Sequence, residues 1–155
     1  MYANQRESRI AKWKHLWLIF SILPLFAQDI NKHNISLGVF DDKTGFSFIG
    51  YTNNIRQAEM DEFFIGAGTM IVGFTGSAGW KHYYKKSKTS FYSVLSAQAV
   101  IHMGFSGLMP NASFGLEYNL SKRVQIKIGG MGGMLWDGSS ADAGVFPFVG
   151  LNFLR

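Results

Sequence analysis

A histidine, a serine and a carboxylate lie within a short stretch of this sequence and could form a catalytic group. If two strands make a hairpin centred between Gly107 and Leu108, His102 faces Ser113, and Glu117 lies farther along the same polar face. A histidine beside a serine and near a carboxylate is the arrangement of a hydrolytic triad. The alternative is a hydrogen-bonded plug of polar side chains, because an eight-stranded barrel has little free interior. We favour the plug and predict no catalytic residues and no enzymatic activity.

The same polar face continues into the next predicted strand. Glu117 and Lys127 flank a short turn and point to one face, nearly opposite each other or one step diagonal. An unpaired charge inside a barrel costs several kcal/mol, so we expect an internal ion pair that fixes the strand register, with a gate as the alternative. The predicted polar cluster of the barrel interior consists of Ser96, Gln98, His102, Ser113, Glu117, Asn119, Gln125 and Lys127.

Three other patterns have a functional and a structural interpretation. Residues 80–88 mix lysines with aromatic side chains, as proteins that bind single-stranded nucleic acid do. In an exported protein a hairpin tip at a membrane boundary is the better interpretation, so we expect no nucleic-acid partner. The glycine cluster at 66–68 lacks the third glycine of a dinucleotide fingerprint. The cluster at 129–133 lacks the Lys-Ser/Thr of a P-loop. They favour close packing and bending of strands instead.

No pattern in the sequence indicates a metal or a cofactor. The four histidines, His15, His33, His82 and His102, have no paired ligand spacing, and the chain has no cysteine. The acidic stretch 137–142 lacks the ligand periodicity and the closing glutamate of a calcium loop, which favours a solvated turn. We therefore predict no metal site and no bound cofactor.

The elements that would carry these side chains are mostly strands. Glycine accounts for 18 of the 155 residues and phenylalanine for 14, a composition that disfavours helices and favours strands. A tight turn is predicted at 41–45, and the polar stretch 53–61 is predicted to be a connection that could hold a helical turn. Eight strands are predicted, at residues 35–41, 45–52, 63–74, 75–84, 91–104, 111–120, 123–136 and 145–154.

Several of these strands alternate apolar and polar residues. Ala112, Phe114, Leu116, Tyr118 and Leu120 share one face, and polar or small residues share the other. The polar faces carry Gly, Ser, Asn and Gln more often than Lys and Glu, which is typical of a crowded barrel interior. Aromatic residues gather near strand ends, as in an interfacial girdle, and strands of roughly 10 residues are long enough to cross a hydrocarbon core when tilted.

The first 28 residues have the pattern of a secretory signal peptide. Basic residues precede an apolar run at 16–26, which ends at Ala27-Gln28. The run is shorter than the roughly 20 apolar residues that a transmembrane helix needs. We expect cleavage near Ala27-Gln28, a single domain at 29–155, and a location outside the cytoplasm. The leader contributes much of the formal net charge of +5, so the charge is weak evidence for a nucleic-acid partner.

The leader, the alternating strands and the last strand together resemble the small bacterial outer-membrane β-barrels. The ending 150–155 is similar to their C-terminal assembly signal, a glycine followed by apolar residues at alternate positions, although it finishes on Arg155 where that class usually has an aromatic residue. The leader end, Phe26-Ala27-Gln28, is similar to those of exported Bacteroidetes proteins. The resemblance implies an outer-membrane location, contact with membrane lipid, and recognition of the last strand by the barrel-assembly machinery.

We therefore predict an all-β protein: one antiparallel up-and-down barrel of about eight strands in the outer membrane, with no open channel and a structural or envelope-associated role. Two other functions stay open. One is a soluble periplasmic barrel, similar to lipocalins, that carries an apolar ligand in its interior. The other is a barrel enzyme that acts on lipids through His102. The sequence does not determine an oligomeric state.

Overall fold

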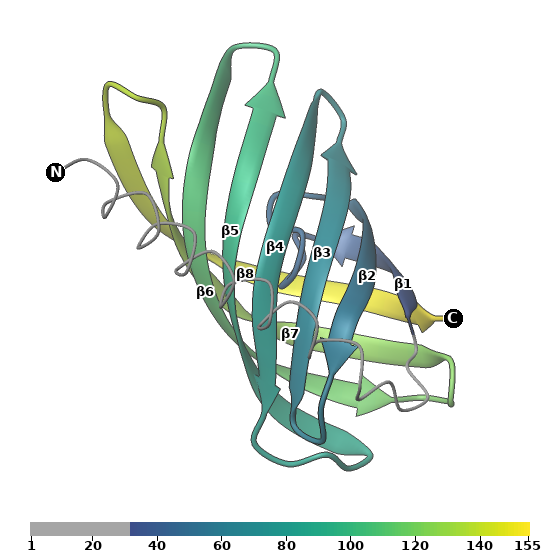
Figure 1. Ribbon diagram of the computed structural model, residues 1–155. Helices are drawn as coiled ribbons and strands as arrows, with labels where there is room; N and C mark the ends of the chain where they lie inside the picture. Colours follow the sequence, from purple (N-terminus) through teal and green to yellow (C-terminus); the bar gives the residue numbers. More distant parts are fainter. Residues whose placement is uncertain (1–31) are drawn as a thin grey trace, which may run out of the picture.

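The computed structural model describes residues 32–155 and consists of one closed barrel (Figure 1). Each strand pairs antiparallel with the next along the chain, and β1 pairs with β8 to complete the circle. Residues 32–155 include no helix that is long and apolar enough to cross a membrane. The strands are β1 (His33–Val39), β2 (Ile49–Gln57), β3 (Asp61–Met70), β4 (Gly73–Tyr83), β5 (Thr89–His102), β6 (Phe105–Asn119), β7 (Val124–Trp136) and β8 (Ala141–Leu154).

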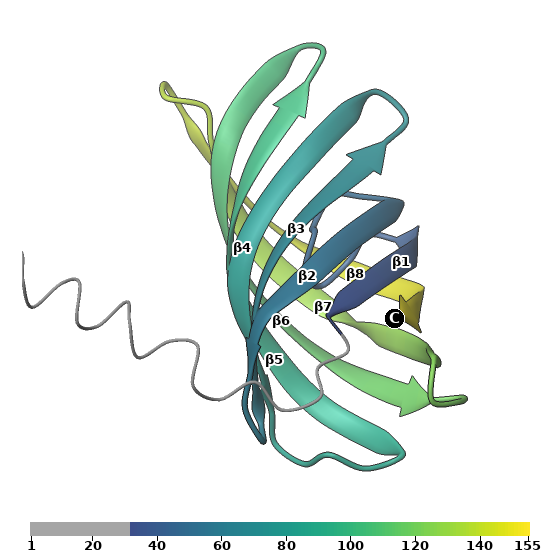
Figure 2. The same cartoon turned by 45° about the vertical axis from the view of Figure 1, so that its right-hand side comes forward.

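The barrel confirms the predicted fold class, an all-β chain of eight antiparallel strands in up-and-down order. The signal peptide predicted at 1–28 lies outside the described residues. Both described chain ends and the turns β2–β3, β4–β5 and β6–β7 lie at one end of the barrel, which we call the terminal end. At the opposite end, the hairpins β3–β4, β5–β6 and β7–β8 extend beyond the short strand β1 (Figure 2).

The polar stretch 53–61 is not a connection with a helical turn. Residues 53–57 continue β2, and Asp61 begins β3, so that only three residues form the turn between the strands. The register shifts between Asn54 and Arg56, where an irregularity breaks the pairing with β3. The prediction was wrong because polar side chains such as Asn54 face a polar lumen here, where burial does not require an apolar residue.

The break between β3 and β4 lies at residues 71–72, before Gly73 and Gly76, and not between residues 74 and 75 as predicted. Both glycines belong to β4, paired with β3 on one side and with β5 on the other. Gly73 therefore begins β4 and Gly76 lies within it, so neither glycine forms the turn.

The hairpin β5–β6 turns at residues 103–104, several residues earlier than predicted. His102 is consequently the register partner of Phe105, whereas Ser113 pairs with Val94. The predicted sixth strand begins at residue 111, whereas β6 begins at Phe105 and includes Pro110, which cannot donate a ladder hydrogen bond. In the barrel, the β6–β7 ladder is interrupted at this proline, so a central strand accommodates it.

The strands alternate between an apolar outer face and an inner face that is largely polar. Leu95 is 52% exposed and Ile101 is 61% exposed, whereas their inward neighbours Gln98 and Val100 are 1% and 2% exposed. The lumen also contains a small apolar cluster, against which the half-buried Phe40, Phe46, Met60 and Phe146 pack. This cluster consists of Phe64, Tyr83, Tyr92, Val94, Met131 and Phe148.

Two facing glycines make room for the inward aromatic rings. Gly115 and Gly129 are register partners on β6 and β7, and the side chain of Phe148 lies over both of them. Tyr92 from β5 covers Gly115 from the other side. A Cβ atom added to Gly129 would lie 2.7 Å from the Cα atom of Gly115, closer than packed atoms approach. The glycines therefore allow two large rings to fit between closely spaced strands.

The contrast between Gly129 and Gly130 tests this packing. We expect Gly129→Ala to destabilise the barrel by about 1–3 kcal/mol, because backbone and ring atoms would have to move. Gly130→Ala is the matched control, since its added Cβ has no neighbour nearer than 4.0 Å. Urea unfolding followed by tryptophan fluorescence measures both. Equal midpoints for the two variants would contradict the packing described here.

Candidate functional site

The connection between β1 and β2 folds into the barrel instead of forming a tight hairpin outside it. Within this luminal loop, residues 40–48, the side chains of Asp42 and Thr44 are fully buried, and Asp41 and Lys43 are nearly so. Phe40, the first residue of the loop, has a φ of 58°, a conformation that is uncommon for a residue with a side chain. The loop occupies space that the sequence analysis assigned to the strand side chains alone.

Asp41 holds the loop in its compact shape. Its Oδ1 atom accepts hydrogen bonds from the backbone amides of Lys43 (2.9 Å) and Thr44 (2.8 Å), and its own amide donates to the carbonyl oxygen of Gly45 (2.9 Å). Gly45 has a φ of 70°, and a Cβ atom there would collide with the side chain of Gln98. The turn thus requires both the short acceptor side chain of aspartate and a glycine.

Lys127 on β7 joins the barrel wall to this loop. Its Nζ atom donates to Asp41 Oδ2 at 2.9 Å and also bonds Asp42 Oδ1. All three side chains are at least nine-tenths buried. Glu117 is the register partner of Lys127, as the sequence analysis expected, but the structure records no ion pair between them. The carboxylates of Asp41 and Asp42 bind the lysine instead, because the luminal loop brings them within hydrogen-bond distance of its Nζ atom.

Lys81 on β4 is the second cation of the lumen. Its Nζ atom lies 2.7 Å from Glu117 Oε2 and 3.6 Å from Asp42 Oδ2. The same atom lies over the ring of Tyr92, 3.7 Å from its centroid, and 4.7 Å from that of Tyr83. Two carboxylates and two aromatic faces therefore surround one ammonium group, an arrangement that compensates for its lost hydration.

The third cation belongs to the loop itself. Lys43 donates to Glu62 Oε2 on β3 at 3.0 Å and to Asn54 Oδ1 on β2 at 3.1 Å. Gln57 donates to the other oxygen of Glu62, at 3.1 Å. The loop is thus tied to β2 and β3 through Lys43 and to β4 and β7 through its aspartates.

Amide side chains extend the network toward the terminal end. Gln125 donates to Glu117 Oε1 at 2.7 Å and to Asn119 Oδ1 at 2.8 Å, and Asn152 donates to Gln125 Oε1 at 2.9 Å. These groups border a polar cavity of about 180 Å³ that is also lined by Lys81. Hydrogen bonds consequently cross from β6 to β7 and β8, and they link the last strand to the charged centre.

The residues predicted as the interior polar cluster fall into two groups. Buried in the lumen are Gln98, Ser113, Glu117, Gln125 and Lys127, while Ser96, His102 and Asn119 are half-buried. The hydrolytic arrangement is not formed, since the register of β5 and β6 separates His102 from Ser113 along the strands. His102 instead accepts a 3.3 Å hydrogen bond from the amide of Gly104 in the adjacent turn.

The sequence analysis missed Asp41, Asp42, Lys43, Glu62 and Lys81 as members of the site. The aspartates and Lys43 were assigned to a tight turn, and Lys81 to a hairpin tip at a membrane boundary. The structure shows Glu62 on β3 and Lys81 on β4 as register partners at inward positions. A charge at an inward position of the alternation is the one signal that could have identified them. Within residues 32–155, no group of three or more histidine or acidic side chains is placed to hold a metal ion.

The charged residues of the described chain fall into three zones. Those of the lumen are Asp41, Asp42, Lys43, Glu62, Lys81, Glu117 and Lys127. Those of the terminal end are Lys32, Arg56, Glu59, Asp61, Lys85, Lys86, Lys88, Lys122, Arg123 and Arg155. Asp137 and Asp142 lie at the β7–β8 hairpin tip, where hydrogen bonds from the backbone amide of Ser140 and from the amide and hydroxyl of Ser139 lower the pKa of Asp137 to about 2. The outer wall between the two ends therefore carries no charge from residues 32–155.

Comparisons with protein-family models, with curated proteins and with solved structures gave no match. The functional argument for this chain consequently depends on the geometry described above.

Replacement of Lys127 tests whether the luminal loop is held by charge. We expect Lys127→Gln to lower the free energy of unfolding by about 3–5 kcal/mol, because Asp41 and Asp42 would stay buried without their cation. Combining it with Asp42→Asn should recover part of the loss. Denaturant unfolding provides the measurement, with the exposed Lys122→Gln as control. A stability unchanged from wild type would show that the loop does not depend on this contact.

Proposed function

We propose that this protein is a small outer-membrane β-barrel with a structural or envelope-associated role and without an open channel. The observation that supports this most directly is the distribution of polarity. The outer wall is apolar and uncharged between its two ends, and the buried interior contains the ion pairs. A soluble protein has a polar surface and an apolar core, and this barrel has the reverse. An apolar outer surface suits contact with acyl chains, where an exposed charge is costly and an exposed leucine is not.

The outer wall also has the dimensions and the aromatic residues that a bilayer requires. The long strands β5 to β8 contain 13–15 residues, more than the roughly 9–11 that a tilted strand needs to cross the hydrocarbon core. Near the terminal end, Tyr84 stacks on Phe91 with ring centroids 5.2 Å apart, and the indole of Trp80 donates to Asp61 at 2.7 Å. Such rings have an apolar body and a polar tip, which favours the membrane boundary.

A soluble barrel that carries an apolar ligand is supported less well. A carrier of that kind needs an apolar cavity in its lumen, whereas here the luminal loop and its ion pairs occupy the centre. An apolar hollow of about 910 Å³ does exist, but outward residues such as Phe63, Leu95, Ala97 and Pro110 line it. The apolar surface of this barrel is therefore directed away from its axis.

The closed lumen supports a role without conduction. An eight-stranded barrel is just wide enough for side chains to fill, and here the loop adds further atoms to that space. The last strand, β8, pairs with both β1 and β7 and ends beside the first residue of β1. We assign β8 as the segment that the barrel-assembly machinery would recognise, in keeping with the alternating apolar residues at 150–155.

The non-enzymatic role is part of the same proposal. Since the register separates His102 from Ser113, the group that could have acted on lipids is not assembled.

A lysine on the outer wall tests the membrane proposal. Leu95 lies in the middle of β5 and points outward, so Leu95→Lys should destabilise the barrel in phospholipid vesicles by about 2–4 kcal/mol. Ala58→Lys, in the exposed turn between β2 and β3, should leave stability unchanged. Urea titrations in vesicles, read by the heat-dependent mobility of the barrel in gels, give the comparison. Recovery of the wild-type protein from the soluble periplasm without detergent would refute the membrane location.

The His102→Ala variant tests the absence of catalysis. We expect cells that express it to have the same envelope lipid composition as cells that express the wild type, measured by mass spectrometry of extracted lipids. A deletion strain provides the reference. A lipid change that appears in both the deletion and the His102→Ala strain would establish an enzyme.

A further inference from the structure

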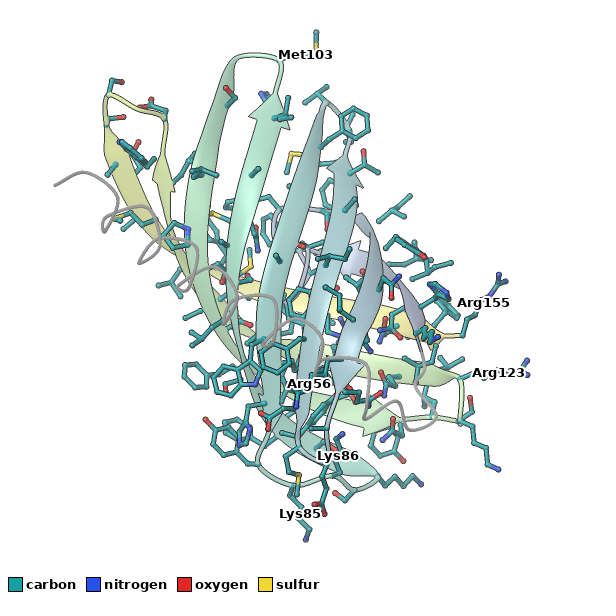
Figure 3. All side chains as sticks on the ribbon, in the orientation of Figure 1. Arg56, Lys85, Lys86, Met103, Arg123 and Arg155 are labelled. Carbon is teal, nitrogen blue, oxygen red and sulfur yellow. The ribbon has the colours of Figure 1, made fainter. Side chains whose placement is uncertain are left out.

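The exposed charge of the barrel is concentrated at one end. A ring of basic side chains surrounds the terminal end; Figure 3 shows Lys85, Arg123 and Arg155 pointing away from the barrel there, while Met103 marks the opposite end. We call this ring the basic collar; it comprises Lys32, Arg56, Lys85, Lys86, Lys88, Lys122, Arg123 and Arg155. All of these side chains are exposed. They come from both ends of the described chain, from β2 and from two turns, so they lie around the terminal end of the barrel and not along one strand.

Within residues 32–155, no acidic side chain forms a salt bridge with this collar. The salt bridges formed within residues 32–155 use Lys43, Lys81, Lys127 and His82 as cations, so the collar contributes none. Two acids share the terminal end with it. Of these, Asp61 is engaged by His82 at 2.8 Å and by Trp80 at 2.7 Å. The terminal end therefore has a surplus of positive charge available to a partner.

The collar borders the aromatic boundary of the apolar wall. Lys88 Nζ lies over the ring of Tyr118, 5.2 Å from its centroid. The ring of His82 on β4 meets the ring of Tyr84, which follows this strand, edge to face with centroids 5.2 Å apart. Lysine and arginine have long apolar stems, which can follow such rings while the charge reaches the polar layer beyond. The cations thus stand at the level where the phosphates of a lipid leaflet would lie.

The opposite end has a different character. Ile71 at the β3–β4 tip is 89% exposed and Met103 at the β5–β6 tip is 88% exposed, and the only charges there within residues 32–155 are Asp137 and Asp142. An anionic surface would therefore attract one end of the barrel and not the other. Because the two ends differ in charge, a partner of the collar would lie on the side of the membrane that the terminal end faces.

We propose that the basic collar binds the phosphate groups of anionic phospholipids in the leaflet next to the terminal end of the barrel. The inference rests on the proposed membrane location and adds a lipid class and a leaflet to it. The cations of the collar are spread around the terminal end, next to the apolar outer wall. This arrangement matches a plane of lipid headgroups better than a single extended strand of nucleic acid. Each lysine or arginine near such a surface strengthens binding, and salt weakens it within a Debye length.

The test compares two lipids on the folded, detergent-solubilised mature protein. Phosphatidylglycerol and phosphatidylcholine with equal acyl chains are titrated, and native mass spectrometry measures the bound fraction. At 0.05 M salt we expect phosphatidylglycerol to bind at least about tenfold more tightly, with the preference falling below about threefold at 0.5 M salt. Replacing Lys85, Lys86 and Lys88 together by glutamine should reduce the preference at low salt to less than about threefold. The matched control, Asp137→Asn with Asp142→Asn, should keep it.

Two results would overturn the proposal: equal binding of both lipids by the wild type, or a triple variant that retains the full preference. Heat-dependent gel mobility confirms that each variant is folded before it is compared. The membrane location is judged separately by insertion into phosphatidylcholine vesicles. A protein that inserts but does not distinguish the lipids retains the proposed function and loses this inference, whereas one that fails to insert contradicts the proposed function.

Discussion

Neutralisation of buried charge is the constraint on which the rest of this structure depends. Closing eight strands into a narrow barrel places every second side chain inside, and here those positions include Lys81 and Lys127. Neither ammonium group could remain in the lumen without a carboxylate nearby. Asp42 from the luminal loop contacts both of them, which explains why the connection between β1 and β2 is turned inward. The loop and the wall are thus parts of one electrostatic unit.

This unit also accounts for the outer surface. Because the acidic and basic side chains of the strands and of the luminal loop pair with one another inside, the wall between the two ends can be apolar. The remaining exposed charges lie in turns, at the ends of the described chain and near strand ends, as Arg56 does on β2. The polarity of the barrel therefore varies in two directions, from polar inside to apolar outside, and from a basic terminal end to an opposite end with apolar tips.

Much of the fold could be predicted from alternation in the sequence, since residues such as Phe114 and Leu116 take turns with polar neighbours over a whole strand. The eight strands, their order and the polar character of the interior followed from that period. The register of the β5–β6 hairpin did not follow. Gly107 and Pro110 resemble a turn in the sequence, yet the β5–β6 hairpin turns earlier, and this shift alone removes the predicted contact between His102 and Ser113.

The sequence by itself determined which side chains share a face, because a period of two is a local property of an extended backbone. Only the tertiary structure decided which of them meet. Glu117 and Lys127 are neighbours in the register, as expected, but each binds a partner that is far away in the chain or belongs to the loop. Which side chains pair depends on closure of the barrel, which brings β4, β7 and residues 40–48 together in the lumen. No local sequence pattern encodes the contacts between these distant segments.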